Sequence, residues 1–176
     1  MKTNILLVLS VFLLTACGEN HNTLTEAEKS EGWQLLFDGQ TAEGWHMYNG
    51  PDTVQGWTVE DGCLLALGKG GDIGGDIVSD QKYENFELKW DWKIAPEGNS
   101  GVMYHVIEHE DFGAPYLTGP EYQMVDDMDF PQELKDWQKT GADYAMYTAD
   151  PEKKEVKPAG EWNTSRIVFD NGHVEH

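Results

Sequence analysis

His105, Glu121 and Gln123 combine groups that can take up a proton with groups that can hydrogen-bond to hydroxyls. They lie in two runs typical of β-strands, Gly101–Glu108 and Glu121–Asp126, joined by a connection rich in Gly, Pro and acidic residues. Side chains of a strand alternate between its two faces, and here both faces mix apolar and polar groups. We therefore predict a sheet with one face on a core and the other lining a polar cleft that contains these three side chains.

The strands that must position this cleft are short and separated by turn signals. Tyr83–Ile94 is the clearest, since every second residue is apolar and most residues between them are charged. Asp61-Gly62 and Asn171-Gly172 each lie between two strand-like runs. Each pair predicts a hairpin, because both turn positions need positive φ, which Asp, Asn and Gly adopt readily. Such a pattern indicates an all-β sandwich or barrel. Further strands are expected at 33–37, 44–48, 57–60, 63–66, 76–79, 142–147 and 162–169, and a long surface loop at 130–140.

The N-terminus is typical of an exported protein. Lys2 precedes an apolar run, residues 5–14, that is too short to span a membrane and fits a signal peptide over residues 1–16. Leu-Thr-Ala-Cys then resembles a bacterial lipobox in which Cys17 is lipidated, with an ordinary signal peptide and an incidental cysteine as the alternative. We expect a polar tether at 17–30, a single domain at 31–176, and a lipid-anchored location in the bacterial cell envelope, periplasmic or on the outer-membrane surface.

Composition narrows the class of partner. The chain has 32 acidic and 12 basic residues and a net charge of -20. Nucleic acids and anionic lipids attract basic patches, so we expect neither as a partner, and membrane contact only through the lipid anchor. With Cys17 lipidated, Cys63 is the one cysteine left and no intrachain disulfide can form. Most of the acidic residues, including Glu108 beside His109, are interpreted as solvated surface.

Six short motifs occur in an order that resembles one protein family. They are Leu35–Gly39 with Gly44-Trp45, Trp57–Gly62, Tyr83–Leu88, Gly98–Val102, Gly119–Gln123 and Gly160–Asn163. Together they resemble the 3-keto-disaccharide hydrolase domain family over about residues 33–176. The resemblance implies a concanavalin A-like jelly-roll β-sandwich and a sugar substrate already oxidised to a ketone at C3. The family continues beyond residue 176, and the last strand here is four residues long, so we expect a C-terminally truncated domain.

The chemistry implied by this resemblance needs one base. The ketone acidifies the neighbouring C2–H, a base removes that proton, the enolate expels the C1 substituent, and water can add back. Glu121 and His105 are then the catalytic candidates, or ligands of a divalent cation, which is the one cofactor we consider. The substrate-binding candidates are Gln123, Asn99, Ser100 and Asp126, with Tyr116 and Trp137 as loop aromatics that can stack on sugar rings.

Each candidate also has a purely structural interpretation. His105 could be a satisfied histidine on a sheet face, Glu121 could fix a loop through Asn99 or Ser100, and Asn99 to Gly101 could be an ordinary turn. A non-catalytic carbohydrate-binding module on a cell-surface lipoprotein is the alternative to a hydrolase or lyase, since the same fold serves both. His105 together with Glu121 favours the enzyme, because a binding face needs no base.

Overall fold

The computed structural model describes residues 22–68 and 75–176. The predicted signal peptide, the lipidation site at Cys17 and the first part of the tether lie outside these residues. No helix in the described part is long and apolar enough to cross a membrane. The elements in chain order are α1 (Glu26–Glu31), β1 (Trp45–Met47), β2 (Trp57–Glu60), β3 (Cys63–Ala66), β4 (Ile77–Ser79), β5 (Phe86–Trp92), β6 (Asn99–Met103), the 3₁₀ turn η1 (Pro115–Leu117), β7 (Glu121–Val125), the 3₁₀ turn η2 (Asp136–Gln138), β8 (Asn163–Asp170) and β9 (His173–Glu175).

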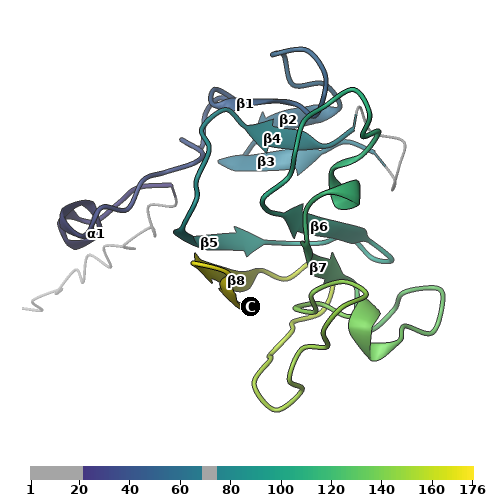
Figure 1. Cartoon of the computed structure of the whole chain (residues 1–176). Helices are drawn as coiled ribbons and strands as arrows, with labels where there is room; N and C mark the ends of the chain where they lie inside the picture. Colours follow the sequence, from purple (N-terminus) through teal and green to yellow (C-terminus); the bar gives the residue numbers. More distant parts are fainter. Residues whose placement is uncertain (1–21, 69–74) are drawn as a thin grey trace, which may run out of the picture.

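The hydrophobic core lies between two antiparallel sheets, one ordered β5-β8-β9 and the other formed by β6 and β7 (Figure 1). In β5 the odd positions are exposed and the even positions are covered, as the sequence alternation predicts. The all-β sandwich prediction is therefore confirmed. The buried members of the core are Trp92, Tyr104, Tyr122, Met124 and Ile167, and the partly buried members are Phe86, Trp90, Ile94, Val102, Phe169 and Val174.

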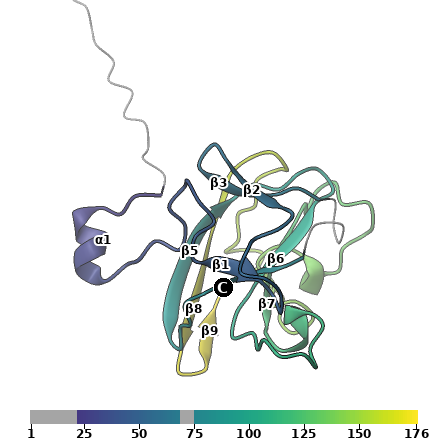
Figure 2. The same cartoon turned by 90° about the horizontal axis from the view of Figure 1, so that it is seen from above.

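Two smaller antiparallel sheets complete the described strands. β1 pairs with β4, and β2 pairs with β3 (Figures 1 and 2). The β2–β3 hairpin turns at Asp61 and Gly62, whose φ angles are 49° and 75°, and the β8–β9 hairpin turns at Asn171 and Gly172, with φ of 48° and 86°. Both predicted hairpins are confirmed, because each turn has the two successive positive φ angles that a tight hairpin requires.

The predicted strand Gly101–Glu108 is correct only in its first half. β6 ends at Met103, and the backbone amide of Tyr104 makes one last bond to the carbonyl of Pro120, at 3.2 Å. His105 then adopts a φ of 53°, which takes the chain out of the strand. A Cβ on Gly119 would lie 2.5 Å from the carbonyl oxygen of Tyr104, so glycine is needed where the two strand ends approach each other.

Three other sequence-based expectations need correction. The expected strand at 33–37 has no strand partner in the described chain, although the carbonyl of Leu36 accepts a bond from Trp45 Nε1 at 2.7 Å. The expected strand at 142–147 is reduced to two isolated bridges through Asp143. The end of the tether forms α1, because Thr25 and Glu28 make a reciprocal capping box at its start. The 130–140 loop is as expected, apart from η2.

Ile167 offers a direct test of this core. Its side chain is fully buried between the two sheets. We expect Ile167→Ala to lower the free energy of unfolding by about 3 kcal/mol and Ile167→Val by about 1 kcal/mol, because each leaves a cavity of different size. Urea denaturation measures both. Leu67→Ala, at a side chain that is 63% exposed, is the control, and an equal loss there would contradict the assigned core.

Candidate functional site

The outer face of the β6–β7 pair carries the strongest candidate carboxylate. The register places Met103 opposite Glu121, Gly101 opposite Gln123, and Asn99 opposite Val125. Cross-strand partners share a face, so these side chains lie on one side of the pair. The side chains that alternate with them, including Tyr122 and Met124, belong to the core. Glu121 is therefore directed away from the core by the same pairing that packs its neighbours into the core.

The side chain of Glu121 lies across Gly101. A Cβ built on Gly101 would be 2.7 Å from both Cγ and Cδ of Glu121 and would overlap its carboxylate oxygen. Gly101 does not have a positive φ, so its role here is to leave space and not to supply an unusual backbone conformation. Gly101, from the Gly98–Val102 motif, thus leaves the space that the carboxylate of Glu121, from the Gly119–Gln123 motif, occupies.

Two carboxyl groups at this site have pKa values above their usual range. Burial raises the pKa of Glu121, and the negative charge of Asp76 raises it further. Desolvation also raises the pKa of Asp76, which immediately precedes β4 and whose carbonyl accepts the amide of Tyr48 at 2.9 Å. Sequence reasoning missed Asp76. The local sequence shows only an acidic residue after a glycine-rich stretch, and this pattern is common in loops that have no catalytic role.

His105 does not join Glu121. Its ring packs on Phe169 with centroids 4.0 Å apart, and also contacts Phe86 and Tyr104, which belong to the core side of the sheets. The expectation of a shared cleft is wrong because β6 ends before His105, so strand alternation no longer sets its direction. The pair is therefore not a shared cation site. Within residues 22–68 and 75–176, no three His, Cys, Asp or Glu side chains are grouped to hold a metal.

Asp126 and Gln123 are buried and bond to backbone groups. The carboxylate of Asp126 is buried and accepts the backbone amides of Glu97, Met128 and Asp129, at 2.9, 3.2 and 3.2 Å. Burial opposes its ionisation, but the three amides together lower its pKa. The side chain of Gln123 is 3% exposed and donates to the carbonyl of Gln138 at 3.2 Å. The prediction that these two bind substrate is therefore corrected.

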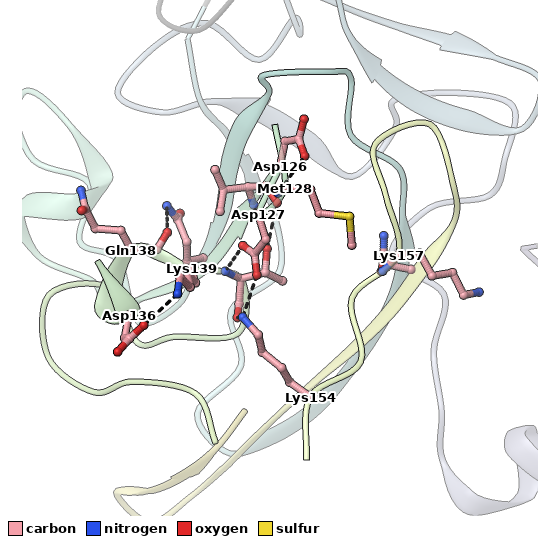
Figure 3. A network of polar contacts seen from close by, with 12 residues as sticks. Asp126, Asp127, Met128, Asp136, Gln138, Lys139, Lys154 and Lys157 are labelled. Carbon is pink, nitrogen blue, oxygen red and sulfur yellow. Dashed lines mark hydrogen bonds and ion pairs between the residues drawn. The ribbon is translucent and has the colours of Figure 1, made fainter. Parts of the chain in front are cut away.

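Asp127 extends this network to the long loop between β7 and β8 (Figure 3). Its carboxylate accepts the amide of Thr140 at 2.8 Å and pairs with the ammonium of Lys154 at 2.7 Å. Lys154 also donates to the carbonyl of Thr140, whose hydroxyl bonds both the amide and the carbonyl of Val125. Residues 126–154 are thus fastened to β7 by these side-chain contacts together with backbone hydrogen bonds that join residues 141–144 to Glu121 and Gln123.

The remaining candidates lie at different places. Asn99 is exposed on the face of Glu121, whereas Ser100 is exposed at a position of the opposite face. Tyr116 in η1 is 66% exposed and free to stack on a ring. Trp137 in η2 is half-buried and packs edge-to-face on Tyr144 with centroids 5.3 Å apart. The structure leaves Asn99 and Tyr116 available to a ligand and occupies one face of Trp137.

Comparison with known proteins identifies the family. The model of the 3-keto-alpha-glucoside-1,2-lyase-like domain matches residues 32–176. This chain belongs to that family. It is 36% identical over 163 residues to the 3-keto-disaccharide hydrolase of Bacteroides thetaiotaomicron, an alignment that covers 84% of this chain. It spans 56% of the length of that relative.

Two solved structures are similar to this chain in fold and in sequence. Two crystal structures from Parabacteroides distasonis ATCC 8503, each described as a "putative glycosyl hydrolase", share the fold. One has a TM-score of 0.78 at 51% identity, over 88% of this chain and 72% of that chain. The other has a TM-score of 0.62 at 29% identity, over 81% and 65%.

The role of Asp126 in the lyase-like domain can be tested by unfolding. Its lowered pKa means that it stabilises the fold above its unfolded pKa of about 3.9, and that this stability is lost as pH falls through the lower folded value. We expect Asp126→Asn to cost about 1–3 kcal/mol near pH 7. Urea denaturation at several pH values should show the difference from wild type shrinking in acid. The exposed Asp129→Asn is the control, and a similar loss there would contradict this role.

Proposed function

We propose that this domain acts on glycosides whose sugar carries a ketone at C3, with Glu121 as the general base that removes the C2 proton. The observation that carries the proposal is the position of Glu121: half-buried, directed away from the core, laid across Gly101, and with a raised pKa. The family and the name of the Bacteroides relative support the substrate class. This chain spans 56% of the length of that relative, so we propose, and do not assume, that it carries out the same reaction.

The reaction requires a base whose pKa is close to the working pH. A carboxylate with a raised pKa is a stronger base than an ordinary surface glutamate. Removal of the C2 proton breaks the C2–H bond, and its electron pair forms a C2=C3 double bond while the C3 carbonyl oxygen takes the negative charge. The C3=O bond then re-forms, and the electron pair of the C2=C3 bond moves to form C1=C2 as the C1–O bond breaks. The departing oxygen takes up a proton, for which Asp76 is the candidate donor because its pKa is also raised. Addition of water to the double bond then completes a net hydrolysis.

The enolate that precedes C1–O cleavage carries its charge on the C3 oxygen and needs a hydrogen-bond donor. Asn99 is the candidate from this chain, since its amide lies on the face of Glu121 and is exposed. His105 has no role in this scheme, because its ring packs against Phe169. The chemistry therefore rests on one carboxylate as base, a second carboxyl as acid, and an amide as donor.

A non-catalytic carbohydrate-binding module is the second candidate. Its supporting observation is Tyr116, which is 66% exposed next to Leu117, 57% exposed, on the connection between β6 and β7. Exposed aromatics of this kind stack on sugars without any chemistry. Measurable binding of a 3-keto-disaccharide and of its unoxidised parent, with turnover of neither, would favour the module over the enzyme.

Glu121→Gln tests the base directly. The amide keeps the size of the side chain but cannot accept the C2 proton, so we expect kcat on a 3-keto-disaccharide to fall about a hundredfold or more. In the wild type, kcat/KM should rise with pH along an acid limb set by Glu121, with an apparent pKa above 4.5. The exposed Glu60→Gln in β2 is the matched control. An unchanged kcat in Glu121→Gln would remove this residue from the mechanism.

Gly101→Ala tests the position of the same carboxylate without changing its chemistry. The added methyl group would overlap the Glu121 carboxylate and must push it aside. We expect kcat to fall about tenfold or more, because small misplacements of a catalytic group are costly. Gly113→Ala, where a Cβ meets nothing within 4 Å, is the control. Full activity in Gly101→Ala would show that the carboxylate need not lie on this surface.

A further inference from the structure

The imidazole of His46 in β1 lies between two carboxylates from distant parts of the chain. Its Nδ1 is 2.7 Å from Oδ1 of Asp80, and its Nε2 is 2.9 and 3.0 Å from the two oxygens of Glu108. Asp80 directly follows β4, the partner strand of β1, whereas Glu108 belongs to the connection between β6 and β7. His46 and Glu108 are also the least exposed members of the group, with side chains 19% and 27% exposed.

Neighbouring groups of the β1 end hold the same segment. The hydroxyl of Tyr48 donates to the carbonyl of Ile107 at 2.8 Å. The side-chain amide of Asn49 donates to the carbonyls of His109 and Phe112, at 2.9 and 2.7 Å, and its backbone amide donates to Glu108 at 3.2 Å. In the part of the chain that the structure describes, residues 105–112 form no strand or helix, so these side-chain contacts replace a sheet partner.

The segment held in this way leads directly to the candidate site. The connection from Tyr104 to Pro120 joins the end of β6 to the start of β7, where Glu121 follows at once. It also carries Tyr116, the exposed aromatic residue that a sugar ring could stack on. A displacement of residues 105–112 would therefore move Tyr116, while the β6–β7 hydrogen bonds would still hold Glu121 in place.

We propose that His46 is a positioning residue: as an imidazolium bonded to both Asp80 and Glu108, it fastens residues 105–112 to β1 and thereby sets the place of Tyr116 for substrate binding. The part of this proposal that concerns substrate rests on the proposed function. The fastening itself does not, because it can be measured on the protein alone. His46 touches no reacting atom in this scheme and acts through Glu108.

The two contacts require a proton on each ring nitrogen, because a carboxylate only accepts hydrogen bonds. Burial favours the neutral ring, but the hydrogen bonds and charges of Asp80 and Glu108 prevail and raise the pKa of His46. These two are the charged groups that face the ring, and the nearby His109 pairs separately with Asp111 at 3.3 Å. The contacts of His46 with Asp80 and Glu108 are therefore fully formed below the pKa of about 6.5 that histidine has in the unfolded chain. They are lost as pH rises through the higher pKa of His46 in the folded protein.

Hydrogen exchange of the whole protein tests the fastening. In the wild type at about pH 5.5, residues 105–112 should be protected, and after correction for intrinsic exchange rates the protection should fall about tenfold or more by about pH 9. His46→Gln should show the low protection at both values. Glu110→Gln, an exposed position in the same segment, should behave as wild type. Protection that does not change with pH in the wild type would overturn the proposal even if His46→Gln failed to fold.

Kinetics on a 3-keto-disaccharide separate the two proposals. His46→Gln should raise KM about tenfold with a smaller change in kcat, because Tyr116 is displaced and Glu121 is not. The limbs set by Glu121 and by Asp76 as acid should remain, whereas the further loss of kcat/KM that deprotonation of His46 causes in the wild type should be absent in the variant. A fall in kcat at constant KM would overturn the role in substrate binding. If the wild type shows no turnover, the proposed function fails and hydrogen exchange alone decides the role of His46.

Discussion

The pairing register of β6 with β7 is the constraint on which the candidate site depends. Gly101 stands opposite Gln123, and this register places Glu121 on the opposite face of β7 from Tyr122 and Met124, which belong to the core cluster. A slip of one residue would exchange the two faces and bury the carboxylate among aromatic rings. Because the core side chains of β7 pack tightly against β5 and β8, such a slip would expose them to water. Hydrophobic packing on one face thus positions the carboxylate on the other.

Polar side chains help to hold the long connections in this domain in place. Asp126 accepts three backbone amides, Asp127 joins Thr140 to Lys154, and Glu108 accepts from both His46 and Asn49. Buried backbone groups must be paired, and loops without a sheet partner need such acceptors. Glu108, which the sequence suggested to be solvated surface, is therefore part of the internal framework, as are Asp126 and Asp127. Their cost of burial is offset by amides and by a few well-placed cations.

Elements with a local signal could be predicted from the sequence, and contacts between distant segments could not. The alternation in β5 and the Asp61-Gly62 and Asn171-Gly172 turns depend on residues close together in sequence, and all are present. His105 was misplaced because nothing local shows that a strand stops two residues before it. Asp76 and His46 were missed for a related reason, because each interacts with a residue that is distant in sequence. Asp76 interacts electrostatically with Glu121, and His46 contacts Glu108. Motif order made Glu121 a candidate base, but it could not show that the loop after β7 would cover Gln123.

The charge of the site is consistent with a neutral sugar as substrate. Glu121 must be ionised to accept the C2 proton, and the chain has a net charge of -20, so an anionic ligand would be repelled at the point where proton transfer is proposed. Burial raises the pKa of Glu121, which makes it a better base in the proposed reaction. A neutral 3-keto sugar is not repelled, and it generates negative charge only after the proton has moved to Glu121, which then becomes neutral. Proton transfer therefore leaves the number of charges at the site unchanged, and moves the charge from the carboxylate to the enolate oxygen, where a donor such as Asn99 can bind it.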